Sequence, residues 1–410
     1  MTWLVVIGGL VLLVFMHELG HFSVALAVGM RPRSFYIGFP PALAKVKHKG
    51  IEYGIGMIPL GGLVRIPGMH RPAGRDLRAF IEPAIREEPS LAAPVGAVRR
   101  ALELEDYATA RELYPELERE VNAAHLSPRS RRAAERALRE VEEGTSQDAY
   151  WRAATWKRVA VIAAGPLANV VIAFLILFIV FAVGGGPSDR PSTKVDSVSA
   201  GTPAAAADLR AGDRIVAVDG TPARTFAVVS HLIRSSQGGA VTLTVVRHGR
   251  RISVGPQPTI FRQGRWIFGF SPAAQLVPFS TGKAARSAAS DLGNVVTGTA
   301  SGIGSLFSKH GRSQVSGPVG IVRVSHAQLQ VGATWYFEIL AFVSMSLALL
   351  NLLPLLPLDG GHILFSLIEG VRRRALAREV YERVSVVGIM LIVLVFVIAF
   401  SNDVSGGTPH

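Results

Sequence analysis

The 410-residue sequence predicts a polytopic α-helical membrane protein with four transmembrane helices, a membrane-associated β-hairpin or small sheet, and one extracytoplasmic α+β domain. Composition is the first observation, since 49% of the residues are hydrophobic and 18% are charged, at a mean hydropathy of +0.34. That is too apolar for an ordinary soluble enzyme and too charged for a chain wholly inside the bilayer. The other two observations are four long apolar stretches and a segment of alternating β-branched residues.

The four predicted spans are apolar stretches of roughly 17–25 residues, the length that crosses the hydrocarbon core of a bilayer. The first has no charged residue outside the motif HELGH, and the second has none at all. The first also lacks a basic leader and a small-residue cleavage site, which argues against a cleaved signal peptide. With their flanks, the spans are assigned to residues 1–28, 156–184, 335–362 and 384–401.

Basic residues near the span ends predict the orientation, because short loops rich in lysine and arginine stay in the cytoplasm. Such residues follow the first span, lie at the start of the second, and separate the third from the fourth: Arg31, Arg33, Arg152, Lys157, Arg158, Arg372, Arg373, Arg374, Arg378 and Arg383. Both termini are therefore expected outside, with 29–158 and 359–383 in the cytoplasm and 184–334 outside. The net charge of +13 is then explained by residues that set the topology and contact anionic lipid headgroups. The sequence contains no zinc-finger spacing or RNA-recognition motif that would indicate nucleic-acid binding.

The motif HELGH carries the chemistry of the first span. His17 and His21 are four residues apart, so they share one helix face and can hold one zinc ion. Glu18 lies beside them and can take a proton from water, whose pKa zinc lowers to about 7. A carboxylate in the middle of a span raises the free energy of membrane insertion by roughly 2.5–3.5 kcal/mol, and binding of a metal ion would compensate that cost. The alternative is three polar residues that face a water-filled cavity or an ion pathway.

A third metal ligand is expected in the segment NLLPLLPLDGGH of the third span, because catalytic zinc takes three protein ligands and keeps one open position. Pro354 and Pro357 cannot both lie in a regular helix, so they predict a broken segment that lines a cavity. The two glycines after Asp359 permit a tight turn, and Asp359 reaches a depth near that of His17 on the cytoplasmic side. His362 is the rival ligand. The absence of cysteine excludes disulfides and thiolate ligands.

Residues 51–66 alternate between β-branched residues and glycines, which predicts a hairpin or small sheet. An exposed edge strand beside an intramembrane site could pair with an unwound substrate and present the scissile bond. Gly56, Gly61 and Gly62 are therefore candidates for substrate binding or site support. The alternative is a sheet that only packs on the bilayer surface.

Residues 71–150 are rich in Ala, Arg, Glu and Leu and predict a cytoplasmic helical hairpin inserted in the chain. Ser127 before Pro128 predicts the N-cap of its second helix, and Gly144 predicts the C-cap. The insertion could bind a partner, or it could be a solvated packing element without further function.

Residues 192–256 predict a PDZ-like domain, because a strand, a small-residue turn, a short helix and a second strand are followed by a helix near 226–235 and another strand. No segment matches convincingly the glycine-containing loop with which PDZ domains bind carboxyl termini, so steric gating is favoured over peptide capture. Residues 276–334 connect this domain to the third span and include a weakly amphipathic helix at 281–308.

These motifs together resemble the M50-like site-2 protease family of intramembrane metalloproteases, in its bacterial branch with one PDZ-like domain. The resemblance lies in HELGH, in GPLAN at 165–169 and in residues 351–360, one motif in each of the first three spans. It extends to residues 29–70 as a membrane-associated β-loop region and to GPVGI at 317–321, but not to the insertion. One departure is Pro357, which follows Asn351 by six residues where many members have five.

The resemblance implies a zinc-dependent intramembrane endopeptidase with one Zn²⁺ per chain, in a bacterial cytoplasmic (inner) membrane. Its metal ligands would be His17, His21 and Asp359, with Glu18 as the catalytic acid and base. Implied substrates are transmembrane segments of single-pass proteins already shortened outside, an anti-sigma factor or a remnant signal peptide. This is regulated intramembrane proteolysis, with an upstream site-1 protease as a possible pathway partner.

Two asparagines are assigned supporting roles by the same resemblance. Asn351 would help to hold substrate or order the metal segment, and Asn169 would support the site or form a helix–helix hydrogen bond. Two other functions stay open: an inactive PDZ-bearing membrane scaffold and a membrane metal-ion carrier. The full set of catalytic residue types disfavours the scaffold, and the gathering of polar residues at one depth disfavours the carrier.

Overall fold

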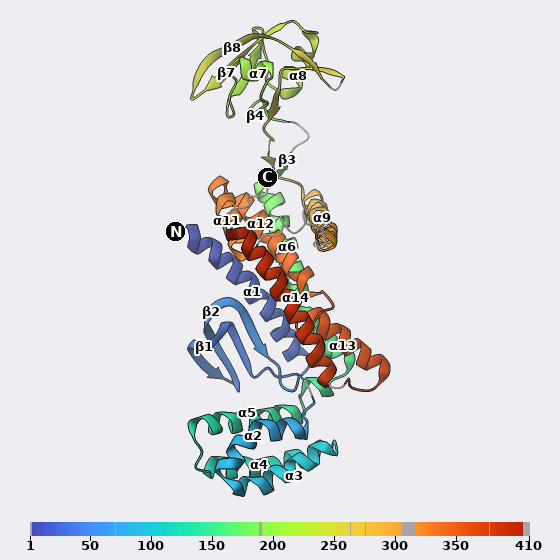
Figure 1. Cartoon of the computed structure of the whole chain (residues 1–410). Helices are drawn as coiled ribbons and strands as arrows, with labels where there is room; N and C mark the ends of the chain where they lie inside the picture. Colours follow the sequence, from blue (N-terminus) through green and yellow to red (C-terminus); the bar gives the residue numbers. More distant parts are fainter. Residues whose placement is uncertain are drawn as a thin grey trace. The chain divides into compact units, whose positions relative to one another are not determined.

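The computed structural model describes residues 2–69, 71–187, 191–262, 264–274, 276–305, 317–376 and 378–404. The chain divides into two compact units, one of Met1–Leu175 with Asp291–His410 and one of Ile176–Ser290. Figure 1 shows the elements of both, and each unit is described here by itself.

Four helices in the described residues are long and apolar enough to cross a membrane, in agreement with the number predicted. They are α1 (Thr2–Ala27), α6 (Thr155–Ile179, extended by a π-helical turn to Gly184), α12 (Ala333–Asn351) and α14 (Arg378–Val404). The predicted break in the third span is present, so α12 ends at Asn351 and α13 (Asp359–Arg372) begins after the two prolines. The fourth helix is longer than the predicted 384–401, because polar turns extend the apolar stretch at both ends.

The sheet beside α1 is built from two long bent strands, β1 (Ser34–His48) and β2 (Ile51–Arg65). Residues 34–37 pair with 52–55 on one side and with 62–65 on the other, and residues 44–48 pair with 51–55. Of the two alternatives predicted for residues 51–66, the small sheet is confirmed and the hairpin is not, because both arms of that segment pair with β1 and not with each other. As a result, residues 62–65 form an edge of the sheet.

The insertion contains four α-helices, so the predicted hairpin was wrong in the number of helices. The helices are α2 (Gly74–Glu87), α3 (Ala92–Glu103), α4 (Tyr107–Ala123) and α5 (Pro128–Thr145), with a short turn η1 (Pro89–Leu91). They enclose one apolar core. The first helix of the predicted hairpin is interrupted at Glu105, which has a φ of 55°, and Asp106 then caps α4 by accepting from the Thr109 N–H at 3.1 Å.

The predicted cap at Ser127 is confirmed, because its hydroxyl accepts from the Ser130 N–H at 3.3 Å. Gly144 is not a C-cap, since α5 continues through Thr145. A Cβ at Gly144 would lie 2.7 Å from Cγ of Pro72, so close packing against the start of the insertion explains this glycine.

Both ends of the insertion are tied to the end of β2. The Tyr150 N–H, in the turn η2 (Tyr150–Arg152), donates to the Pro67 carbonyl at 2.9 Å, and the Trp151 N–H donates to the Gly68 carbonyl at 3.1 Å. Arg65 pairs with Glu143 of α5. Because these contacts hold the last residues of β2, the insertion and the sheet edge form one connected structure.

The second unit contains a four-stranded sheet in the order β6-β5-β7-β8 around its own apolar core. The expected order of strands and helices is present, and the assignment as a PDZ-like domain stays a prediction. The unit reaches beyond residue 256, because β11 pairs with β4. Its elements are β3 (Gly186–Pro187), β4 (Val195–Val198), α7 (Pro203–Ala206), β5 (Arg214–Val218), β6 (Thr221–Pro222), α8 (Phe226–Ser235), β7 (Ala240–Arg247), β8 (Arg250–Pro258), β9 (Ile260–Arg262), β10 (Arg265–Ile267), β11 (Phe270–Pro272) and β12 (Leu276–Val277).

Between the second unit's sheet and α12, the described residues contain two further helices. The helix α9 (Thr281–Ser305) corresponds to the amphipathic helix expected at 281–308, whose last residues lie outside the described ones. The helix α11 (Pro318–Val331) begins within the motif GPVGI.

Candidate metal centre

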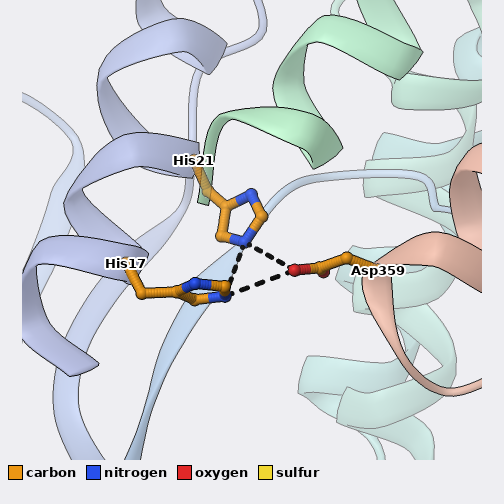
Figure 2. Close-up of side chains that lie close together, drawn as sticks. All are labelled: His17, His21 and Asp359. Atoms are coloured by element: carbon orange, nitrogen blue, oxygen red, sulfur yellow. Dashed lines mark hydrogen bonds and ion pairs between the residues drawn. The ribbon is translucent and has the colours of Figure 1, made fainter. Parts of the chain in front are cut away.

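Three side chains from two distant parts of the sequence meet beside α1. Figure 2 shows His17 and His21 projecting from α1 toward Asp359, the first residue of α13. The Nε2 atoms of the two histidines are 3.3 Å apart. The Oδ2 atom of Asp359 lies 3.2 Å from His17 Nε2 and 3.4 Å from His21 Nε2. These three ligand-type atoms therefore form a nearly equilateral triangle.

The triangle has the size of one face of a tetrahedral zinc site. Bonds of about 2.0–2.1 Å to nitrogen and oxygen place tetrahedral ligand atoms about 3.3–3.4 Å apart. The Asp359 Oδ2 atom is also buried without a hydrogen-bond partner, which a bound cation would correct. Two imidazoles and one carboxylate are a donor set that suits zinc and leaves a fourth position open. The residues present therefore fit the metal.

The ring of His21 is oriented by a backbone group of α6. Its Nδ1 atom donates to the Val161 carbonyl at 2.8 Å, which fixes the tautomer and leaves Nε2 free to bind a cation. Gly165, one turn further along α6, allows the approach, because a Cβ there would lie 2.2 Å from His21 Nε2.

The ring of His17 is oriented by Asn169, which is fully buried and lies 3.3 Å from His17 Nδ1 through its amide. When the Asn169 nitrogen faces the ring, its Oδ1 atom has no partner. The opposite amide orientation lets Oδ1 accept from Nδ1–H, which satisfies the oxygen and leaves His17 Nε2 to bind a cation. We therefore assign the amide with its oxygen toward His17.

The segment before Asp359 folds tightly onto the first turn of α13. A Cβ at Gly360 would lie 2.2 Å from the Leu352 carbonyl oxygen, and one at Gly361 would lie 2.5 Å from the Leu356 nitrogen. Only glycines fit there, so the pair after Asp359 holds the broken segment against the helix and aims the carboxylate at α1.

Glu18 and the sheet edge line a cavity of about 620 Å³ at the metal centre. Gly62 packs directly on Glu18, because a Cβ on this glycine would lie 2.3 Å from Cγ of Glu18. Asn351 also lines the cavity, and its amide nitrogen is 3.5 Å from His17 Nε2. The cavity thus brings a carboxylate, an amide and a strand edge to the open side of the three ligands.

Comparison with known proteins identifies the family. The sequence matches the model of peptidase family M50 over residues 5–395. The chain belongs to peptidase family M50. A putative zinc metalloprotease of Mesorhizobium japonicum is 27% identical over 97% of this chain and 96% of its own length. A putative zinc metalloprotease of Nostoc is 30% identical over 96% and 93%. The regulator of sigma-W protease RasP of Bacillus subtilis is 27% identical over 96% and 95%.

Family membership confirms the resemblance to site-2 proteases. This M50 peptidase is a metalloendopeptidase, zinc is its cofactor, and its four apolar helices make it an integral membrane protein. The zinc expected from HELGH is therefore the metal of the family.

The other residues singled out in the M50 peptidase fall into two groups. Asn169, Asn351, Gly61 and Gly62 lie at the metal centre or line its cavity. Gly56 is not in the cavity wall, since it packs on the backbone of β1. The rival ligand His362 lines the cavity but stands outside the three-residue cluster. The Val161 carbonyl was missed, because a backbone acceptor leaves no signal in the sequence.

Proposed function

We propose that this M50 peptidase cleaves transmembrane segments of single-pass membrane proteins, with zinc bound by His17, His21 and Asp359. The triangle of ligand atoms, 3.2–3.4 Å on each side, is the observation that carries the proposal. Two of its three residues, His17 and His21, lie on α1, one of the apolar helices long enough to cross a membrane, which supports hydrolysis within the membrane.

Glu18 acts as general base and then as general acid in this proposal. Zinc, when bound, polarises the scissile carbonyl and lowers the pKa of water to about 7. Glu18 follows a ligand histidine in the sequence and lines the same cavity, so its carboxylate can take the proton of the attacking water. The same carboxylate then returns the proton to the leaving amine nitrogen. The Asn351 amide can donate to a substrate carbonyl, because it faces the cavity from α12.

The edge of the sheet binds the substrate backbone in an extended form. A helical segment satisfies its own amides, so its peptide bonds are shielded until it unwinds. Residues 62–65 pair with β1 on one side only, and residues 61–65 line the cavity. A substrate that unwinds loses its helical hydrogen bonds. Its backbone would form new hydrogen bonds with residues 62–65 when it is added as a strand at the open side of the edge. Gly62 then sits between the substrate strand and Glu18.

The orientation proposed from basic residues places both termini and the segment 184–334 outside, with the insertion in the cytoplasm of a bacterium. The metal centre then lies toward the cytoplasmic side of the inner membrane. The second unit, proposed as one PDZ-like domain, would exclude substrates that still carry a bulky external domain. An upstream protease that shortens the substrate outside is the corresponding partner.

The substrate class includes anti-sigma factors, with remnant signal peptides as the second class. The name of the Bacillus subtilis relative, regulator of sigma-W protease, supports the first. The proposed site requires a transmembrane segment that can unwind, and both substrate classes contain such a segment.

The test measures metal and cleavage together. Wild-type protein should contain one zinc per chain and cleave a single-span reporter peptide in bilayer nanodiscs. Glu18→Gln should keep the zinc and lose cleavage by about 10²–10⁴-fold, the usual contribution of a general acid–base group. Equal cleavage by wild type and Glu18→Gln would reject the mechanism.

A further inference from the structure

An apolar groove of about 430 Å³ lies between α1, α11 and α12 of the first unit. One stripe of α12 forms its longest wall, with residues at intervals of three and four: Ile339, Phe342, Val343, Ser346, Leu347 and Leu350. The other walls are one turn of α1 and the first half of α11. Among the described residues that line it, Ser346 alone has a polar side chain, so the groove matches an apolar ligand.

The groove leads into the cavity of the metal centre. Val14 of α1 and Leu347 of α12 line both the groove and the cavity. On α1 the lining continues from Val14 to the ligand His17 three residues later, and on α12 Leu350 is followed directly by Asn351. A segment that lies along the groove is therefore directed to the reacting side of the site.

The wall formed by α11 is held in place from two sides. Asp403, near the end of α14, is buried and accepts from the N–H groups of Gly317 and Gly320 at 3.1 and 2.9 Å. The ring of His326 stacks on Trp3 of α1, with centroids 3.9 Å apart. These contacts fix α11 against α14 and α1, so the groove exists before anything binds in it.

We infer that this groove binds the transmembrane helix of the substrate before it unwinds, an inference that rests on the proposed function. Helices associate in membranes through close packing, which small residues such as Gly320 and Ser346 on the walls permit. A helix with side chains is about 10 Å wide, so the groove takes the side chains of one helix face. Val324 and Leu350, 40% and 47% exposed, are the most exposed apolar side chains of the lining and are available to that face.

Two valines on α11 give a matched test by obstruction. Val324 lines the groove, whereas Val319 is similarly exposed at 46% but lies outside its lining. Val324→Trp should lower cleavage of the single-span reporter peptide about tenfold or more, while Val319→Trp should leave it unchanged. Both variants should retain wild-type zinc content. Equal cleavage by the two variants, as expected if only lipid occupies the groove, would overturn the inference.

Cross-linking gives a readout that does not depend on turnover. The chain has no cysteine, so single cysteines can be introduced at Val324 or Val319 in the Glu18→Gln background. A reporter peptide with one cysteine in its transmembrane segment should cross-link to position 324 and not to position 319. Equal cross-linking at both positions would overturn the inference that the groove binds the substrate helix. If wild type still cleaved the same peptide, the proposed function would stand. A peptide that wild type fails to cleave would reject the function and the inference together.

Discussion

Gly165→Ala should weaken zinc binding by displacing His21, one of the three proposed ligands. A methyl group at this position would lie 2.2 Å from Nε2 of His21, although ordinary contact begins at 3.4 Å. The imidazole must therefore move by about 1.2 Å, well beyond the ±0.2 Å tolerance of a zinc bond. The backbone of α6 cannot supply that space, because His21 is bonded to the same helix at Val161.

The expected magnitude follows from the size of that displacement. Changes that misplace a ligand from outside the coordination sphere cost about 10–100-fold in metal affinity. A 1 Å misplacement also costs about 10²-fold in rate. Zinc affinity is measured by competition with a chromogenic chelator, and zinc content by elemental analysis of the purified protein.

Gly8→Ala is the matched control, because Gly8 lies in the apolar helix α1 and its added Cβ would meet no other described part of the chain within 4 Å beyond its own helix. This variant should keep wild-type zinc affinity and cleavage, since alanine is a better helix former than glycine. If Gly165→Ala binds zinc as tightly as Gly8→Ala, then His21 does not bind the metal in the position described and the ligand triangle is incorrect.

Three other outcomes are expected. Gly62→Ala should keep zinc but lower cleavage about tenfold or more, because the methyl collides with the side chain of Glu18, the proposed general base; zinc loss would contradict this assignment. Asn169→Leu should weaken zinc binding by about 10–100-fold in the chelator assay by freeing the His17 ring, and an unchanged affinity would exclude the proposed amide orientation. In the second unit, burial would raise the pKa of Asp213, but two hydrogen bonds from Arg247 at 2.8 Å help to hold that pKa below its ordinary value. This carboxylate therefore stabilises the unit above about pH 4, and its contribution is lost as the pH falls through the folded-state pKa. Arg247→Leu should cost about 3–5 kcal/mol at pH 7 and flatten the acid side of the stability profile, measured by hydrogen exchange; an unaltered profile would refute the pairing.

The residues of the candidate metal centre could be predicted from the sequence because they are polar residues within apolar spans. His17 and Glu18 are costly in a span, and their spacing with His21 matches a known chemical pattern. Asp359 could be reached through two prolines and a depth argument. The end of α12 at Asn351 could also be predicted, because the prolines that follow lack the N–H groups that a continuous helix would need.

The packing around the ligands could not be anticipated from the sequence. Nothing in a run of apolar residues shows that Gly165 of α6 faces His21, or that a carbonyl accepts its proton. The register of the sheet was equally hidden, because residues 51–56 and 61–65 have the same alternating character and could pair with each other as well as with β1. The number of helices in the insertion was underestimated for two reasons. Glu105 divides a continuous helical pattern into α3 and α4, and α2 was not predicted as a separate helix.

The insertion leaves the membrane unit and returns to it at one place. Residues 67–68 and 150–151 are joined by two backbone hydrogen bonds, so the 81 residues between them begin and end side by side. A linker the length of a tight turn would bridge that gap. The four-helix bundle can therefore be treated as an exchangeable module, available for removal, for replacement by a fluorescent or affinity domain, or for transfer to another scaffold, without stretching the strand edge beside the proposed zinc ligands.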